Sequence, residues 1–194
     1  LNRIVAIISL GLGLYQLNEF LICITKVPVF TILAMSVTAI LPALAISFAL
    51  VVWKKKLNSM WMMLIYSPAI FFIIMFSVNT YLNNSAQCMS VFVQYPDSGL
   101  IGRFFGLYYF VYILGAAALF NFSSTHSKSV PEKRISQLGL LSMFVFPVPT
   151  FIFLIFLPSL EVQFAIILCE FALLLAIEFI FLLWYKEKHK LSYK

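Results

Sequence analysis

The sequence predicts an all-α integral membrane protein, a polytopic helical bundle with six transmembrane helices in one domain spanning residues 1–194. The chain is 63% hydrophobic and only 10% charged, so it has too little polar surface to cover a water-soluble globule. Most of its apolar runs reach about 20 residues, the length with which a helix crosses a bilayer. If these runs alternate in direction, eleven of the thirteen Lys and Arg residues fall on one side of the membrane.

Six apolar runs define the predicted spans in chain order. They lie at 4–24, 29–53, 60–82, 104–120, 138–157 and 162–185. An α-helix rises 1.5 Å per residue, so a run of about 20 residues covers roughly 30 Å of hydrocarbon. The connections at 25–28 and 158–161 are short, and we expect the helices that they join to be antiparallel neighbours.

The basic residues predict the orientation of this bundle. Cytoplasmic loops retain Lys and Arg, so the side that carries most of them is expected to be cytoplasmic, with both chain ends on it. The residues on that side are Arg3, Lys54, Lys55, Lys56, Lys128, Lys133, Arg134, Lys186, Lys188, Lys190 and Lys194. Lys26 and Arg103 fall on the outer side. The sequence thus predicts a multi-pass protein of the plasma membrane.

Two further features fit this orientation. All three tryptophans, Trp53, Trp61 and Trp184, fall at predicted cytoplasmic span ends, where an interfacial aromatic belt is expected. The net charge of +6 needs no nucleic-acid partner, because the basic residues lie where anionic lipids of the inner leaflet would meet them. The lipid bilayer is therefore the expected partner of this surface.

Two connections are long. The outer one, at about 83–103, is the most polar part of the chain outside the spans, and its Val91, Phe92 and Val93 fit a short strand or an interfacial segment. The inner one, at 121–137, is Ser-rich and reads as a loop, at the end of which Pro131 and Glu132 match a helix N-terminus.

The cysteines give little information at this stage. Cys23 and Cys169 lie in or at the end of spans, and Cys88 lies in the outer connection. Their spacing matches no metal site, and no pair can be assigned as a disulfide from the sequence. We therefore expect no metal and no bound cofactor.

Polar side chains in the outer half of the predicted bundle are the candidate ligand-binding residues. They are Gln16, Asn18, Glu19, Asn79, Arg103, Gln163 and Glu170. One interpretation is a pocket in which Arg103 and a carboxylate hold a small ligand, because ionisable groups at membrane depth usually have a function. The other is a set of interhelical hydrogen bonds that hold the bundle together.

Glu178 is a separate case. It lies about two helical turns from Glu170, nearer the cytoplasmic side and away from the other polar residues. It is expected to be protonated or paired with a neighbour that the sequence does not identify, and it is a candidate for proton coupling. Its role is left open.

Prolines interrupt three predicted spans. Pro42 and Pro68 each remove one backbone donor, and the nearby pair Pro147 and Pro149 should disrupt the fifth span most. This pair is the candidate hinge, and a static kink is the alternative.

Two tyrosines share one face of the fourth predicted span. Tyr108 and Tyr112 are four residues apart, so their hydroxyls either line a pocket or bond a carbonyl of a neighbouring helix.

Catalytic motifs are absent from the sequence. The two histidines, His126 and His189, fall in the inner connection and the tail, and no zinc-protease, nucleophile-elbow or phosphate-loop pattern occurs. We therefore expect that this chain is not an enzyme.

The order of these features resembles the N-terminal seven-transmembrane sensory region of bacterial and archaeal histidine kinases. The resemblance is carried by 41–50 (LPALAISFAL), 64–69 (LIYSPA), the approach to the aromatic span at 102–112, and the inner segment 129–137. It covers nearly the whole chain with diffuse patterns. It implies the input half of a two-component receptor, whose kinase or other output module would follow. It also implies a seventh helix before Leu1, and it fixes no ligand.

The expected function is therefore that of a membrane-embedded sensor. It would detect an extracellular or intramembrane cue and pass a helix movement to a cytoplasmic signalling module, with a homodimer as a possible assembly. Two alternatives stay open, namely the substrate-binding membrane subunit of an energy-coupling-factor transporter and a structural membrane protein without a ligand. The sequence specifies neither the ligand nor the oligomeric state.

Overall fold

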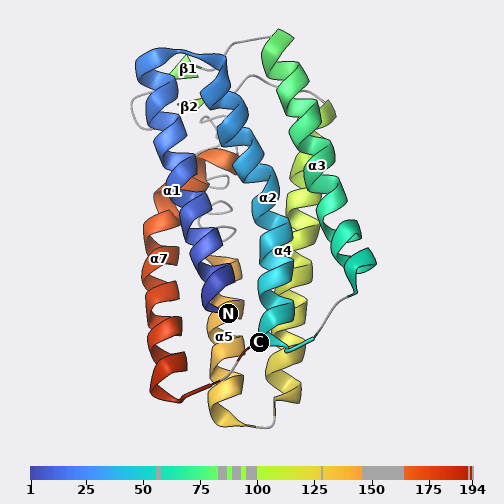
Figure 1. Cartoon of the computed structure of the whole chain (residues 1–194), viewed down its shortest axis with the longest axis vertical. Helices are drawn as coiled ribbons and strands as arrows, with labels where there is room; N and C mark the ends of the chain where they lie inside the picture. The colour runs from blue at the N-terminus through green and yellow to red at the C-terminus, as the bar shows by residue number, and fades with distance from the viewer. Residues whose placement is uncertain are drawn as a thin grey trace, which may run out of the picture.

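The structure is a computed structural model, and it describes residues 1–55, 58–82, 87–88, 93–94, 100–127, 129–145, 164–191 and 193. Within these ranges the chain forms long, roughly parallel or antiparallel helices and one small β-hairpin (Figure 1). In chain order the elements are α1 (Asn2–Thr25), α2 (Pro28–Val52), α3 (Ser59–Leu82), β1 (Gln87–Cys88), β2 (Val93–Gln94), α4 (Leu100–His126), α5 (Val130–Phe144) and α7 (Phe164–Lys188).

Four of the described helices are long and apolar enough to cross a membrane. They are α1, α2, the first twenty residues of α3, and α4. This confirms a helical fold with membrane-length apolar helices. The count of six spans stays a prediction, because the fifth and sixth predicted spans both include residues outside the described ranges.

The outward faces of the described helices support a membrane environment. Leu10, Met63, Leu107 and Ile180, from four different helices, are each more than half exposed. A water-soluble monomer rarely exposes apolar surface so widely. These faces are suited to contact with lipid acyl chains.

The ends of α1, α2 and α3 fall within two residues of the predicted spans. The inner segment at 121–137 differs, because α4 continues to His126 and α5 already begins at Val130. Its serines stabilise helices there. The Ser129 side chain accepts a hydrogen bond from the Glu132 backbone N–H at 3.4 Å, which caps α5. Ser123 and Ser136 join their buried hydroxyls at 2.9 Å between α4 and α5.

Helix α2 lies at the centre of the described bundle. It packs against α1, α3 and α4, and α5 packs mainly against α4, whereas α7 packs against α5 and α1. Buried alanines on α2, among them Ala39, Ala43 and Ala49, allow the neighbouring backbones to approach closely. The short connection after α1 makes α1 and α2 the antiparallel neighbours that the sequence predicts.

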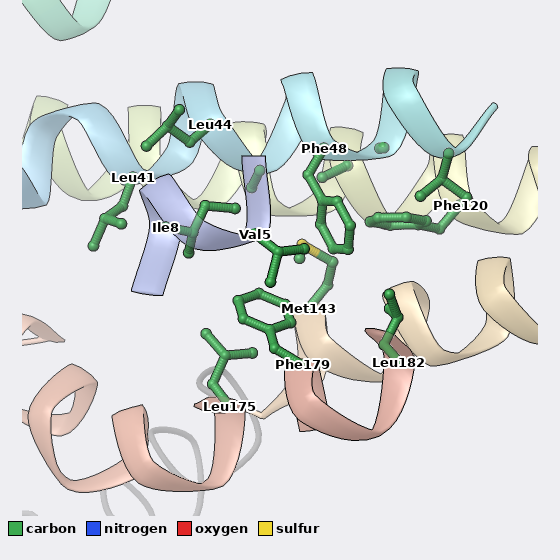
Figure 2. Packing of buried hydrophobic residues seen from close by; sticks show 14 of the residues in the cluster. Val5, Ile8, Leu41, Leu44, Phe48, Phe120, Met143, Leu175, Phe179 and Leu182 are labelled. Atoms are coloured by element: carbon green, nitrogen blue, oxygen red, sulfur yellow. The ribbon is translucent and has the colours of Figure 1, made fainter. Parts of the chain in front are cut away.

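An aromatic cluster fills the inner half of the core (Figure 2). The Phe48 ring on α2 meets Phe120 of α4 at 5.1 Å and Phe179 of α7 at 5.6 Å, both edge to face. Gly139 on α5 lies directly under the Phe120 ring, with no room there for a β-carbon. This glycine lets α5 approach α4 closely.

Candidate functional site

The outer end of the described bundle contains a disulfide. Cys23, near the end of α1, is bonded to Cys88 in β1, and the hairpin pairs Cys88 with Val93 and Gln87 with Gln94. The bond therefore ties the outer connection to α1. Both cysteines fall on the predicted outer side, although the sequence alone assigned no pair.

Two of the predicted ligand-binding residues on α1, Asn18 and Glu19, form hydrogen bonds within this helix. The buried Tyr15 hydroxyl donates to the Glu19 carboxylate at 2.6 Å. The buried Asn18 amide donates to the Leu14 carbonyl at 2.7 Å. Gln16 is exposed. These two contacts lie within α1 and do not by themselves form a pocket between helices.

The other predicted ligand-binding residues are only partly described. Arg103 on α4 is exposed, and the structure gives no ion pair between it and Glu19. Gln163 lies outside the described residues, as do the side chains of Asn79 and Glu170. The outer ligand pocket therefore stays a prediction. The same holds for the hinge at Pro147 and Pro149, which also lie outside the described ranges.

The two tyrosines on α4 bond carbonyls of neighbouring helices. Tyr108 donates to the Ala39 carbonyl at 2.9 Å, and Tyr112 donates to the Ile65 carbonyl at 3.0 Å. Each acceptor lies three residues before a proline, Pro42 in α2 and Pro68 in α3, where the helical ladder is weakened. Of the two roles that the sequence left open, the structure therefore shows carbonyl bonding.

A small cavity lies inside the bundle between α1, α2, α4, α5 and α7. Its volume is about 30 Å³. Its lining is almost entirely apolar and is formed by Ile8, Leu12, Leu41, Ala45, Tyr109, Ile113, Ser142, Met143, Leu175 and Phe179. A cavity of this size holds roughly two water molecules, so it is too small for a metabolite.

Glu178 lies on the inward side of α7, one turn from the buried residues Leu175 and Leu182. Both of its carboxyl oxygens are buried, and neither has a hydrogen-bond partner among the residues that the structure describes. Ser142 of α5 is the polar side chain that lies next to this carboxyl group. The Ser142 hydroxyl itself donates to the Leu138 carbonyl at 3.1 Å, so its proton is already in use.

At the inner end, the C-terminal tail turns away from α7 and runs back towards the end of α2 (Figure 1). Lys190 adopts a left-handed conformation with φ of 49°, and the Leu191 N–H bonds back to the Lys186 carbonyl at 3.1 Å, which ends α7 and turns the chain. Leu191 and Tyr193 then pack against the main hydrophobic core. The tail thereby connects the end of α7 to the region where α2 ends and α5 begins.

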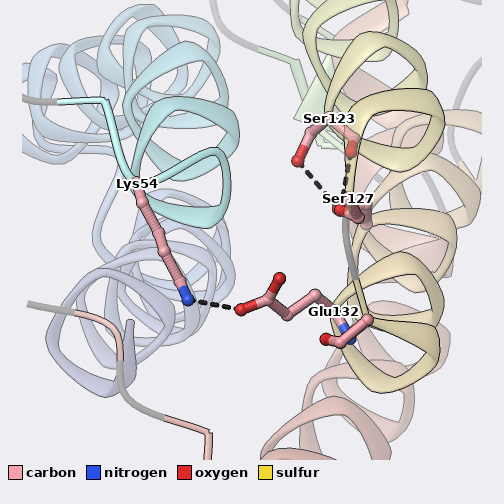
Figure 3. Close-up of polar contacts among 6 residues, drawn as sticks. Lys54, Ser123, Ser127 and Glu132 are labelled. Carbon is pink, nitrogen blue, oxygen red and sulfur yellow. Dashed lines mark hydrogen bonds and ion pairs between the residues drawn. The ribbon is translucent and has the colours of Figure 1, made fainter.

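An ion pair between α2 and α5 lies where the tail docks (Figure 3). Lys54, directly after α2, pairs with Glu132 in the first turn of α5. The Lys54 ammonium also lies 5.2 Å from the centre of the Tyr193 ring. Burial, and secondarily the nearby Glu132 carboxylate, raises the pKa of Tyr193 above its usual value. We call Lys54, Glu132 and Tyr193 the inner clasp.

Among the residues that the structure describes, no group of His, Cys, Asp or Glu side chains is placed to hold a metal ion. Comparison of the chain with family models, with curated proteins and with solved structures gave no match.

Proposed function

We propose that this chain is the membrane-embedded input domain of a receptor. It would detect an extracellular or intramembrane cue and pass a helix movement to a cytoplasmic output module. The observation that carries the proposal is the arrangement of α7, which packs at the edge of the bundle against α5 and α1. Its tail then reaches the inner clasp between α2 and α5. A shift of α7 would therefore change contacts at the inner end.

Two features of the structure support a cytoplasmic inner end. The described basic residues at the ends of α2 and α7 and at the start of α5, among them Lys54, Lys133 and Lys186, gather at the end that holds Leu1 and Tyr193. The disulfide lies at the opposite end, beside Lys26. Disulfides persist mainly in oxidising compartments outside the cytoplasm. Charge and cysteine chemistry thus favour the same orientation, with six spans and both ends of the chain inside.

The reading frame that encodes the chain tests the proposal directly. Continuation past Lys194 into a helical dimerisation segment and a kinase, cyclase or DNA-binding module is the expected result. A stop codon beside genes for transport ATPase subunits would contradict it and favour the transporter alternative.

Substitution of the outer residues tests whether the cue enters through the predicted pocket. In the full-length protein we expect Arg103→Ala and Glu170→Ala to reduce the response of the output module. The control is Lys26→Ala, which removes an outer cation that is not among the predicted ligand-binding residues. If both variants respond like the unmodified protein, the outer pocket is wrong.

A structural role without a ligand is the second candidate, and one observation favours it. Tyr15 and Asn18 form hydrogen bonds inside α1, as expected for side chains that stabilise a helix in the membrane. An output module that responds to no cue in any variant would support this role.

A further inference from the structure

We propose that Glu178 is a proton-binding site inside the bundle, where the carboxyl group lies between α7 and α5 as a neutral acid that can turn to donate a hydrogen bond to the Ser142 hydroxyl oxygen. Loss of the proton would leave a buried charge without hydrogen-bond donors and loosen α7. The ligand of the site is the proton itself. Only the last step, in which a looser α7 alters the output, rests on the proposed function.

The first argument is the hydrogen-bond inventory around the carboxyl group. An ionised carboxylate only accepts hydrogen bonds, and neither Glu178 oxygen receives one. The Ser142 proton is already donated to the Leu138 carbonyl, so Ser142 has only lone pairs to offer. A protonated carboxyl can donate to those lone pairs. Between the two protonation states, the neutral one fits the groups that are present.

The second argument is the absence of a compensating charge in the described part of the bundle. No charged group acts on Glu178, and the side chains that α1 and α2 bring to this face of α7, such as Val5, Ile8 and Phe48, are apolar. From α5 the facing polar group is Ser142, and from α4 the titratable Tyr109 lines the adjoining cavity. An isolated buried charge costs several kcal/mol, so ionisation here requires a rearrangement.

The third argument is the cavity, because Ser142 forms part of its wall. An apolar cavity wall suits the neutral acid better than the carboxylate. Once ionised, the carboxylate needs donors, and about two water molecules fit in the space next to Ser142. Hydration of the carboxylate would replace apolar packing between α5 and α7 and so loosen their contact. A proton is thereby coupled to the position of the helix that leads into the tail.

The test uses the whole chain in micelles of an alkyl maltoside detergent, which has no carbonyl group. Infrared spectra recorded over a pH series report the C=O stretch of protonated carboxylic acids. We expect the unmodified protein to show such a band at neutral pH, to lose it as the pH rises, and to lack it in Glu178→Gln. In Ser142→Ala the band should remain but move in frequency, because its hydrogen-bond acceptor is gone.

A distance measurement tests the coupling to α7. Spin labels at Leu141→Cys on α5 and Ile180→Cys on α7, both exposed positions, would be introduced into a protein in which Cys169 is replaced by Ala. The separation should increase with pH in the otherwise unmodified protein and stay constant in Glu178→Gln, whose neutral amide still donates to Ser142.

Two results would overturn the proposal. One is an infrared spectrum in which Glu178→Gln removes no band, since Glu178 would then be ionised at neutral pH. The other is the same pH-dependent separation with and without Glu178→Gln. If Glu178→Gln fails to fold, the frequency shift in Ser142→Ala decides alone, and an unshifted band contradicts the site. None of these measurements depends on an output module, so the proton site and the receptor function fail independently.

Discussion

Single residues set how closely the helices of this bundle approach, and Gly139 shows this most clearly. A β-carbon at Gly139 would lie 2.3 Å from the Phe120 ring, which is fully buried against Phe48. The ring cannot move aside without disturbing Phe48. We expect Gly139→Ala to lower the free energy of unfolding by about 1–3 kcal/mol through overpacking.

The matched control for this prediction is Gly13→Ala in α1. A β-carbon at Gly13 meets nothing within 4 Å, so the same chemical change should be neutral or slightly stabilising there. Both variants would be compared by denaturant unfolding in detergent micelles. Equal unfolding midpoints for the two variants would show that α4 and α5 are not packed as described.

Hydrogen bonds at single residues were only partly predictable from the sequence. The spacing of Tyr108 and Tyr112 placed both hydroxyls on one face of a helix, but not the helices that they contact. For Asn18 and Glu19, the sequence could not distinguish bonds within α1 from bonds between helices. Both arrangements satisfy the same polar groups, and only the relative rotation of the helices decides between them.

At the scale of elements, the two α4 tyrosines link α4 to two proline-containing helices. Tyr108→Phe and Tyr112→Phe keep the rings and remove only the hydrogen bonds to the Ala39 and Ile65 carbonyls. Each substitution should cost about 0.6 kcal/mol, and at most about 1.7, as for other side-chain hydrogen bonds in membrane bundles.

The control for these variants is Tyr185→Phe at the inner end of α7. The structure gives no hydrogen bond from the Tyr185 hydroxyl in the part of the chain that it describes, and its ring packs on His189. Unfolding in bicelles would give the three free energies. A cost above 3 kcal/mol for either α4 variant would indicate that the hydroxyl supports more than one carbonyl bond.

The boundaries of α1, α2 and α3 were predictable because apolar runs end there at Lys, Pro or Asn. The helical structure of 121–137 was not, because Ser-rich composition normally indicates a loop. In the folded chain, Ser123 and Ser136 bond each other between two helices, and Ser129 caps α5. Propensity scales do not include such tertiary partners, which is why composition alone wrongly predicted a loop, although Pro131 and Glu132 correctly marked the start of α5.

At the scale of the whole molecule, the disulfide closes a loop between residues 65 positions apart and fastens the outer connection to α1. We expect Cys23→Ser to lower the free energy of unfolding by about 2–4 kcal/mol, the usual effect of losing a native disulfide. A reductant that cannot cross the membrane should have the same effect when added outside. Thermal unfolding in vesicles measures both.

Cys169→Ala is the control for the disulfide prediction. This variant should stay as sensitive to the external reductant as the unmodified protein, whereas Cys23→Ser should become insensitive. An effect that appears only when the reductant is placed inside would reverse the proposed orientation. No sequence pattern could pair Cys23 with Cys88, because the pairing depends on which helix the outer connection folds over.

The inner clasp joins the tail after α7 to the end of α2 and the start of α5. Its contribution to holding the tail can be measured. Tyr193→Ala removes the ring that packs on the core and lies beside Lys54. The Lys54–Glu132 pair is half exposed on the Lys54 side, so it contributes at most about 1 kcal/mol, and the ring should dominate. We therefore expect Tyr193→Ala to release the tail and increase its cleavage by a protease added on the inner side.

Lys54→Gln should have a smaller effect, and Lys188→Gln, whose ammonium lies over Trp184 away from the clasp, should have none. If the cleavage rates of Tyr193→Ala and Lys188→Gln are the same, the tail is not docked against the bundle. A movement of α7 would then have to reach the output module without passing through the clasp.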